Sequence, residues 1–219
     1  MAFYPIYLTR LDEHKVALIG GNEEAERKTI ELLSFDAKIH VISASLTERL
    51  EQLYREGKFE WTSRDYRYGD LEGVAFAVAA DYTREIAIDA SREAAERNLF
   101  INVMDNIPLS NAAFGSVIRR GKLTVSFSTN GIAPALAVRL KERFGEELDG
   151  AYGEFLEIAS RLRDPVMHLI REPDLRKQKW YEWVDSDTLE MLRKGDRTAA
   201  LKTTESVWGS EVIALARLR

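Results

Sequence analysis

Short apolar runs alternate with helix-favouring stretches along the chain up to about residue 130. The predicted strands cover residues 16–19, 38–42, 59–62, 74–80 and 99–103. One predicted helix begins near Glu23, and two others cover residues 46–56 and 83–98. Apolar strands that are separated by helices predict a parallel sheet covered on both faces. The ligands of such sheets bind at the carboxyl ends of the strands.

The pattern then changes to one that predicts a hairpin followed by a helix. Residues 113–118 and 123–128 flank the basic stretch Arg119–Lys122, which predicts two paired strands with a basic turn. Residues 135–144 predict a helix, and Pro134 fits its first turn because proline lacks the N–H that is unused there.

The last third of the chain has a helical and charged pattern from Glu146 onward, in which Pro165 and Pro173 are expected to separate helices. The end of this region is too rich in large apolar residues for a solvated tail. These residues are Trp180, Tyr181, Trp183, Leu189, Leu192 and Trp208. We therefore expect the C-terminal part to form a packed helical domain.

The junction between the first strand and the first helix contains two glycines. In a dinucleotide-binding turn the first glycine makes the tight turn, the second lets the backbone approach the pyrophosphate, and the third position keeps the helix near the strand. Gly20, Asn22 and Ala25 occupy these positions. Alanine is accepted at the third position, but Asn22 places a side chain where phosphate would meet bare backbone. The turn therefore indicates the fold more strongly than the cofactor.

Together these patterns predict an α/β fold with a Rossmann-type parallel sheet. We expect a Rossmann-like, NAD-binding domain at residues 1–113, a small α+β dimerisation region at residues 114–145 and a helical C-terminal domain at residues 146–219.

Composition and charge exclude several classes of protein. The chain has 219 residues, 45% of them hydrophobic, which is enough for one large domain or two small ones. A net charge of -5 gives no general attraction to nucleic acid. The absence of cysteine excludes disulfides, thiolate nucleophiles and thiolate metal sites. No signal-peptide core and no window near ~18 consecutive apolar residues is found, so we expect a cytoplasmic protein without a membrane segment.

Five segments carry a family resemblance that spans nearly the whole chain. They are Tyr4–Leu8, Val16–Lys28, Asn102–Asp105, Ile118–Gly121 and Ser128–Ala137. In this order and spacing they resemble the precorrin-2 dehydrogenases, a family that includes the dehydrogenase and ferrochelatase half of sirohaem synthase. The likeness continues at Lys179–Tyr181 and Thr203–Glu205 in the helical end.

The resemblance implies an NAD-dependent oxidation of precorrin-2 to sirohydrochlorin, followed in some members by insertion of ferrous iron as a transient substrate. Asp105 matches the catalytic residue of the family. A carboxylate is suited to accept the proton that is lost while NAD takes the hydride. The alternative from position alone is that Asp105, which follows a strand, caps the next turn.

The resemblance also places the cofactor. The residues that match the pyrophosphate and adenosine positions are Gly20, Gly21, Asn22, Glu23, Glu24, Ala25, Ser43, Ala44, Ser45 and Asp81. The chain departs from the family pattern at Asn22, where glycine is usual, and at Asp81 and Ala87, where polar contacts are usual. Glu23 and Glu24 also favour the positive end of a helix dipole, and we prefer this explanation to an acid–base pair.

The resemblance places substrate contacts at Arg119, Arg120, Ser128 and Thr129. A tetrapyrrole with eight carboxylates needs cations, and guanidinium groups recognise carboxylates well. Lys141 and Arg143 are clustered nearby but also fit the solvated face of a helix. For the two hydroxyls, hydrogen bonding within a turn is an equally good explanation.

We expect no resident metal site, because the three histidines are far apart and have no ligand spacing. His40 alternates with apolar residues in a strand and is more consistent with structure than with metal ligation. The departures from the family pattern at Asn22, Asp81 and Ala87 leave a second hypothesis open: a sirohydrochlorin chelatase or tetrapyrrole carrier that has lost NAD binding. A third is a non-catalytic pathway partner. The resemblance further implies a homodimer and a separate uroporphyrinogen methyltransferase upstream, without nucleic acid or membrane as partners.

Overall fold

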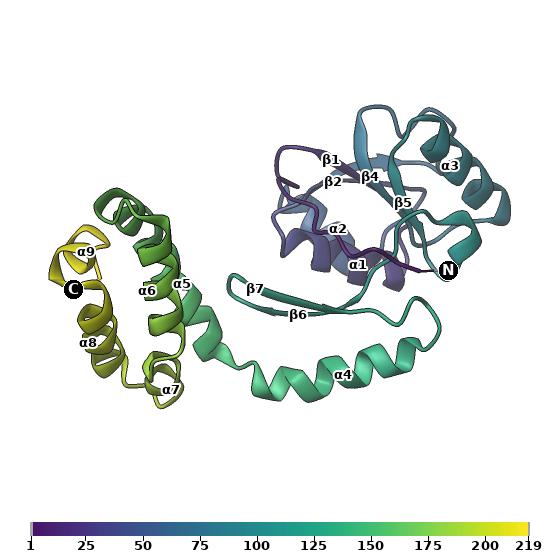
Figure 1. Ribbon diagram of the computed structural model, residues 1–219. Coiled ribbons are helices and arrows are strands. Elements are labelled where there is room, and N and C mark those ends of the chain that lie inside the picture. Colours follow the sequence, from purple (N-terminus) through teal and green to yellow (C-terminus); the bar gives the residue numbers. More distant parts are fainter. Residues whose placement is uncertain (1, 219) are drawn as a thin grey trace. The chain divides into compact units, whose positions relative to one another are not determined.

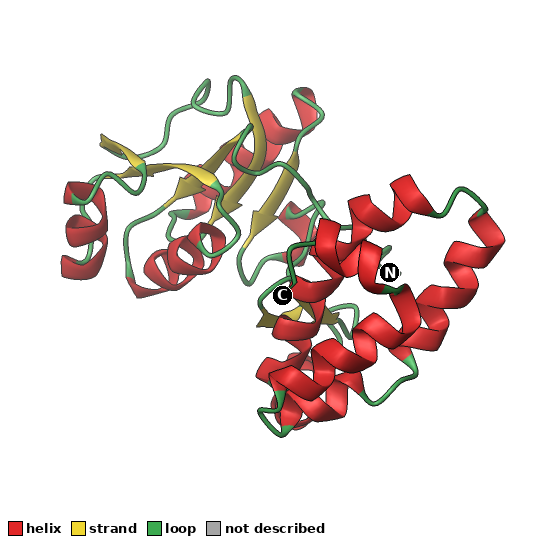
Figure 2. Ribbon diagram, turned by 90° about the vertical axis from the view of Figure 1, so that its left-hand side faces the viewer, coloured by secondary structure: helices red, strands yellow, loops and turns green. Residues whose placement is uncertain are grey.

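The computed structural model describes residues 2–218, and the chain divides into two compact units, one ending at Phe114 and the other beginning at Gly115. The elements of the first unit are β1 (Lys15–Ile19), α1 (Glu23–Leu33), β2 (Lys38–Ser43), α2 (Glu48–Arg55), β3 (Glu60–Ser63), β4 (Val74–Ala79), α3 (Arg84–Glu96), β5 (Phe100–Val103) and the 3-10 helix η1 (Ile107–Leu109). Figures 1 and 2 show these elements as a central sheet with helices on both sides.

The sheet of the first unit has five parallel strands in the order β3-β2-β1-β4-β5. The chain therefore passes from β1 outward to β3 and then returns to the other side of β1, which makes the gap between β1 and β4 the point where the winding reverses. Ligands of open parallel sheets bind at this reversal, beside the carboxyl ends of the strands. The structure confirms the predicted α/β fold and its parallel sheet.

Alternate residues of β1 face two separate cores. Val16 and Leu18 pack with α1 and α2, whereas Ala17 and Ile19 pack on the side of α3. All four side chains are buried, with exposed fractions of 2% or less. Because successive side chains of a strand point to opposite faces, only a strand that is covered on both faces reads as a continuous apolar run.

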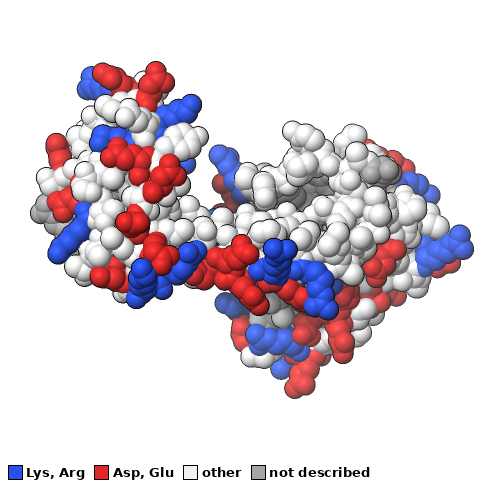
Figure 3. Space-filling view, turned by 60° about the horizontal axis from the view of Figure 1, so that its bottom comes forward, with Lys and Arg blue, Asp and Glu red and all other residues white. Residues whose placement is uncertain are grey.

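The second unit consists of a hairpin and six helices within the described residues. Its elements are β6 (Ser116–Arg120), β7 (Leu123–Phe127), α4 (Pro134–Glu147), α5 (Gly150–Leu169), α6 (Pro173–Val184), α7 (Thr188–Arg193), α8 (Arg197–Trp208) and α9 (Ser210–Leu215). The hairpin strands are antiparallel. On the face in Figure 3, acidic and basic side chains intermingle over the helical part of this unit.

The core of the second unit is built around Trp183, which is fully buried. Its ring stacks on Phe155 at a centroid distance of 4.1 Å, and its Nε1 donates to Thr204 Oγ1 at 3.0 Å. Trp180 and Trp208 pack at its edges. The three tryptophans thus lie in the core of a helical domain, as the sequence predicted, whereas Tyr181 is 61% exposed and does not. No helix between residues 2 and 218 has the length and apolar character to cross a membrane.

Two local predictions were wrong. Pro165 does not separate helices, because α5 continues through it to Leu169. Packing of Ile158, Leu162 and Val166 into the core outweighs the single backbone hydrogen bond that a proline removes. Arg119 and Arg120 lie in strand β6 rather than in the turn of the hairpin. Pro134 and Pro173 begin helices, as expected. A boundary near residue 145 stays a prediction.

Candidate functional site

The turn after β1 is possible only because residues 20 and 21 are glycines. Gly20 has φ +118°, and a Cβ there would lie 2.5 Å from the Cβ of Asp81. A Cβ on Gly21 would lie 1.9 Å from the carbonyl oxygen of Ser45. The turn therefore touches the loops that follow β2 and β4, and a side chain at either glycine would push these loops apart.

Asn22 is the N-cap of α1. Its backbone is extended, with φ -80°, so the unusual backbone angles that asparagine tolerates are not needed here. The Oδ1 atom accepts hydrogen bonds from the backbone N–H of Glu24 at 3.1 Å and of Ala25 at 3.0 Å. These N–H groups are donors that a helix start offers to a phosphate. In this structure the Asn22 side chain takes the place that an anion would otherwise occupy.

The neighbouring predicted residues lie where the sequence placed them, around the same turn. Glu23 and Glu24 are in the first turn of α1, where acids favour the positive end of the helix dipole, and Glu24 pairs with Arg27. Ser43 ends β2, and its hydroxyl donates to the carbonyl of Ser45 at 2.7 Å. Ala44 and Ser45 are exposed. The two glutamates explain the helix start, and the serine explains the shape of the loop after β2.

A pocket of about 200 Å³, the acidic pocket, opens beside this turn. Its lining residues come from the ends of β1, β2, β3 and β4 and from the start of α3. They are Ile19, Gly20, Ile42, Ser43, Asp65, Tyr66, Asp81, Tyr82, Thr83 and Ile86. Ala87, one of the departures from the family pattern, lies on the buried face of α3. The pocket lies at the reversal of the winding, where the topology predicts a ligand.

Asp105 follows β5 at the same edge of the sheet. Its φ of +58° is in the left-handed region, which only a few per cent of residues other than glycine adopt. The carboxylate is exposed, and it makes no hydrogen bond or ion pair with any residue from 2 to 218. It therefore does not cap the following turn. This is the pattern of a side chain that is held out by the backbone and is not used by the fold.

Electrostatic effects connect Asp105 with the acidic pocket. Tyr82, which lines the pocket, donates its hydroxyl to the carbonyl of Met104, the residue before Asp105. Burial raises the pKa of Tyr82, and the negative charge of Asp105 raises it further. The hydrogen bond to Glu24 raises the pKa of Arg27, and Asp105 contributes to this rise. Asp105 thus lies beside the pocket without lining it.

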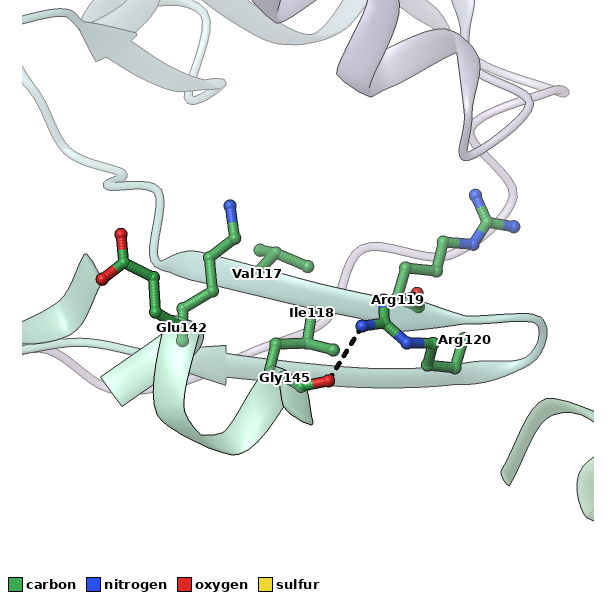
Figure 4. Close-up of a pocket in the computed structure, with 7 residues that line it drawn as sticks. Val117, Ile118, Arg119, Arg120, Glu142 and Gly145 are labelled. Carbon is green, nitrogen blue, oxygen red and sulfur yellow. Dashed lines mark hydrogen bonds between the residues drawn. The ribbon is translucent and has the colours of Figure 1, made fainter. Parts of the chain in front are cut away.

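The second unit has a pocket of opposite charge. This basic pocket, of about 280 Å³, is lined by Val117, Ile118, Arg119, Arg120, Lys141, Glu142 and Gly145. Figure 4 shows the guanidinium groups of Arg119 and Arg120 directed apart, with the carboxylate of Glu142 at the other end. Arg120 donates to the carbonyls of Gly145 at 3.0 Å and Arg119 at 2.9 Å. Carbonyl groups do not neutralise the charge of a guanidinium group.

The one acid of the basic pocket is already paired. Glu142 Oε2 lies 2.7 Å from Nη1 of Arg139, which is outside the pocket lining. Lys122, from the predicted basic turn, points elsewhere and pairs with Glu157 at 3.0 Å. Lys141 is exposed on α4, which agrees with its alternative interpretation as part of a solvated helix face, but it also lines the pocket. Three cations therefore share the pocket with an acid whose charge is compensated from outside it.

The hydroxyls of Ser128 and Thr129 hold the turn before α4. Ser128 Oγ accepts from the backbone N–H of Asn130 at 3.2 Å, and Thr129 Oγ1 accepts from that of Ala133 at 3.2 Å. Because Ala133, the N-cap of α4, makes no capping bond itself, these hydroxyls serve the turn. Substrate contact by either residue stays a prediction.

One buried acid, in α3, was not predicted from the sequence. Glu93 in α3 is fully buried and accepts hydrogen bonds from the Tyr66 hydroxyl, from Gly69 N at 2.8 Å, from Leu71 N at 3.1 Å and from Arg97 Nε at 2.7 Å. These bonds tie the loop between β3 and β4 to α3. Its position in the helix could have indicated burial, since Glu93 shares the buried stripe of α3 with Ala90 and Ala94.

His40 is a structural residue of the sheet. Its Nε2 lies 2.7 Å from Thr62 Oγ1 on the neighbouring strand β3. Burial lowers the pKa of its imidazole, which keeps the ring neutral. Among residues 2–218 no group of three or more histidine or acidic side chains is arranged to hold a metal ion.

Comparison with protein families gives two matches. The family described as putative NAD(P)-binding matches residues 7–116, and the sirohaem synthase dimerisation region matches residues 151–207. The first match covers half of the chain and coincides with the first unit. The second covers most of the helices that follow α4, whereas the sequence analysis expected dimerisation contacts at residues 114–145.

Relatives and solved structures point the same way. The chain is 32% identical over 212 residues to siroheme synthase 1 of Aeromonas salmonicida, which covers 96% of this chain and 45% of that protein. It is 31% identical over 208 residues to the siroheme synthase of Azotobacter vinelandii, covering 94% and 44%. The chain thus spans less than half the length of these relatives. In fold it is similar to SirC, precorrin-2 dehydrogenase, with a TM-score of 0.75 and 20% identity over 94% of this chain and 98% of that chain.

Proposed function

We propose, from the premise that the chain belongs to the putative NAD(P)-binding family shared with the sirohaem synthases, that it oxidises precorrin-2 to sirohydrochlorin with NAD. The observation that carries this proposal is the uncommitted carboxylate of Asp105 at the carboxyl end of β5, beside the acidic pocket. The oxidation releases one proton, and this side chain, which has no partner among residues 2–218, can accept it.

The residues of the turn fit a dinucleotide with one restriction. Gly20 and Gly21 let the turn pack directly against the loops after β2 and β4, and the start of α1 lies next to them. The restriction is that the Asn22 Oδ1 atom already accepts from the N–H groups of Glu24 and Ala25. We infer that NAD binds here but gains less from the helix start than it would at a glycine in position 22.

In the proposed reaction the substrate loses a hydride and a proton. NAD supplies the hydride acceptor when it is bound. Asp105 accepts the proton, and its left-handed backbone holds the carboxylate away from internal partners. The second unit offers cations to the carboxylates of the substrate, since Arg119, Arg120 and Lys141 line the basic pocket and its acid, Glu142, is paired with Arg139.

A chelatase without NAD chemistry is the second candidate, and the capped turn favours it. Asn22 fills the helix start, and Asp81 brings a carboxylate next to Gly20, where it repels phosphate. Asp105 retains a role in this alternative, since it would accept pyrrole protons while ferrous iron, as substrate, enters the macrocycle.

One experiment separates the candidates. The purified protein is incubated without oxygen with precorrin-2 and NAD, and the absorption spectrum of sirohydrochlorin is followed. A second reaction contains sirohydrochlorin and ferrous iron but no NAD. Product in the first reaction supports the dehydrogenase, and product in the second alone supports the chelatase. If neither forms product, the enzymatic proposals are rejected and a non-catalytic partner remains.

A homodimer is proposed from the matched dimerisation region and from exposed apolar residues before and in α4. Ile132, Leu136 and Val138 are exposed by 83%, 53% and 46%, which is costly unless another surface covers them. Light scattering of the purified protein tests this proposal, and a monomer at micromolar concentration contradicts it. The upstream methyltransferase and the cytoplasmic location stay predictions.

A further inference from the structure

The acidic pocket has two polar groups that the protein itself does not use. The hydroxyls of Ser43, Tyr66 and Tyr82 all donate to other parts of the chain. Thr83 Oγ1 accepts from the backbone N–H of Ile86 as the N-cap of α3. The carboxylates of Asp65 and Asp81 make no hydrogen bond or ion pair with any residue in the described range 2–218.

The pocket therefore offers acceptors and apolar walls to a ligand. An ionised carboxylate can only accept hydrogen bonds, so a group that fits between these acids must donate. Ile19, Ile42 and Ile86 supply apolar surface. The volume of about 200 Å³ is below the ~300–1,000 Å³ of pockets that hold a whole drug-sized ligand, so it accommodates one part of a dinucleotide.

The topology indicates which part. In dinucleotide-binding sheets the adenosine half lies toward the end of the second strand, and the pyrophosphate lies at the glycine turn. The acidic pocket contains Ser43 from the end of β2 and Asp65 from the loop after β3. Phosphate is unsuited to a pocket with two carboxylates, whereas adenine has flat apolar faces and an exocyclic amino group that donates.

Asp65 is held in place on both sides. Arg64 before it forms two hydrogen bonds with the carboxylate of Asp70, each 2.7 Å long. Tyr66 after it is tied to the buried Glu93. A group that is fixed before the ligand arrives loses little entropy on binding, which favours recognition by position. Asp81 differs, because it packs against Gly20 and so lies at the turn that faces the phosphates.

We propose that Asp65 determines the base specificity of the nucleotide site by accepting a hydrogen bond from the exocyclic amino group of adenine. This inference rests on the proposed function, since it needs a dinucleotide in the turn. It assigns the two carboxylates different roles: Asp65 reads the base, and Asp81 weakens the binding of any dinucleotide through charge repulsion.

The test compares NAD with nicotinamide hypoxanthine dinucleotide, in which a carbonyl oxygen replaces the amino group. Calorimetric titration of the purified protein should show about fivefold to tenfold weaker binding of the hypoxanthine compound, because its oxygen would face a carboxylate at an exposed site. In Asp65→Asn the difference should vanish, since an amide can accept from the amino group or donate to the carbonyl.

Asp81→Asn is the matched control. It should strengthen the binding of both dinucleotides and keep their ratio, because it removes charge near the phosphates and leaves the base contact. Equal affinities in the unchanged protein, or a ratio that persists in Asp65→Asn, overturn the proposal while the dehydrogenase function stands. If neither dinucleotide binds, both fail. The unchanged protein alone decides the first outcome, even if a variant does not fold.

Discussion

The two units hold pockets of opposite character. Among residues 2–218, the uncommitted polar groups of the acidic pocket in the first unit are the carboxylates of Asp65 and Asp81, and that of the basic pocket in the second is the ammonium group of Lys141. An acceptor-only pocket suits a neutral base with an amino group, and a cationic pocket suits a ligand with carboxylates. Side-chain groups that the fold does not use, rather than charge alone, therefore indicate what each unit binds.

The largest effect is expected at a carboxylate that belongs to neither pocket lining. Asp105→Asn should lower kcat for precorrin-2 oxidation by about 10²-fold to 10⁴-fold, because an amide cannot take the proton. The melting temperature should not change, since the Asp105 side chain has no partner among residues 2–218 and asparagine tolerates a φ of +58°. Stopped assays without oxygen give kcat, and calorimetry gives the melting temperature. An unchanged kcat would contradict the role of Asp105 as the proton acceptor.

A smaller effect is expected in the basic pocket. Lys141→Gln should raise KM for the tetrapyrrole about fivefold and leave kcat and NAD affinity unchanged, because it removes one unneutralised cation. Lys122→Gln is the matched control, since Lys122 is already paired with Glu157. Steady-state kinetics of the two variants provide the comparison. Equal effects of both would mean that the pocket has no special role and that net charge attracts the substrate.

Changes at the turn test how far the first unit favours a dinucleotide. Asn22→Gly should tighten NAD binding about threefold, because the N–H groups of Glu24 and Ala25 become available, at a cost of a few tenths of a kcal/mol in unfolding free energy. Asn22→Asp caps the helix equally well but adds a negative charge, so it should weaken binding. Calorimetric titration of both variants measures these changes. Tighter binding in the aspartate variant would contradict the assigned role of the cap.

The smallest effect concerns the wall of the acidic pocket. Burial raises the pKa of Glu93, but the hydrogen bonds from Tyr66, Gly69, Arg97 and Leu71 outweigh burial and lower the pKa below the ordinary 4.5. As pH falls, the unfolded chain takes up this proton first, so the stabilisation is complete above pH 4.5 and is lost as pH falls through the lowered value.

Urea unfolding between neutral and acidic pH measures this loss. In Glu93→Gln the part of the slope that belongs to this carboxyl should disappear, and the exposed Glu96→Gln on the same helix should keep it. A slope that is unchanged in Glu93→Gln would mean that the loop between β3 and β4 is not held by this acid.

Much of the fold follows from local patterns. Strands buried on both faces appear as apolar runs, and glycine and proline mark turns and helix starts, as at Gly20 and Pro134. The prediction that Pro165 separates two helices was wrong because the effect of a proline depends on the packing around it. The prediction that Arg119 and Arg120 lie in the hairpin turn was wrong because the length of the turn depends on strand register. The register pairs Arg120 with Leu123 and leaves only two residues between them.

The candidate site was predictable only in part. The glycine turn and Asp105 have a sequence signal, because position after a strand and family resemblance both mark them. Asp65 and Glu93 do not, since each looks like an ordinary surface charge in its own segment, and Lys141 could not be told apart from the solvated face of a helix. Their importance depends on neighbours that are distant in the sequence, such as Tyr66 for Glu93, which are 27 residues apart.

The order of strands and helices, the turn at Gly20 and the position of Asp105 after the last parallel strand can all be inferred from the amino-acid sequence, because they depend on residues close together in the chain. Which polar groups the fold uses became visible only in the folded chain. The side chains of Asn22, Ser128 and Thr129 hydrogen-bond within the chain, whereas those of Asp65, Asp81 and Asp105 have no partner between residues 2 and 218. Each donor or acceptor can make only a few hydrogen bonds, so a group is available to a ligand only if other parts of the folded chain do not already bond to it.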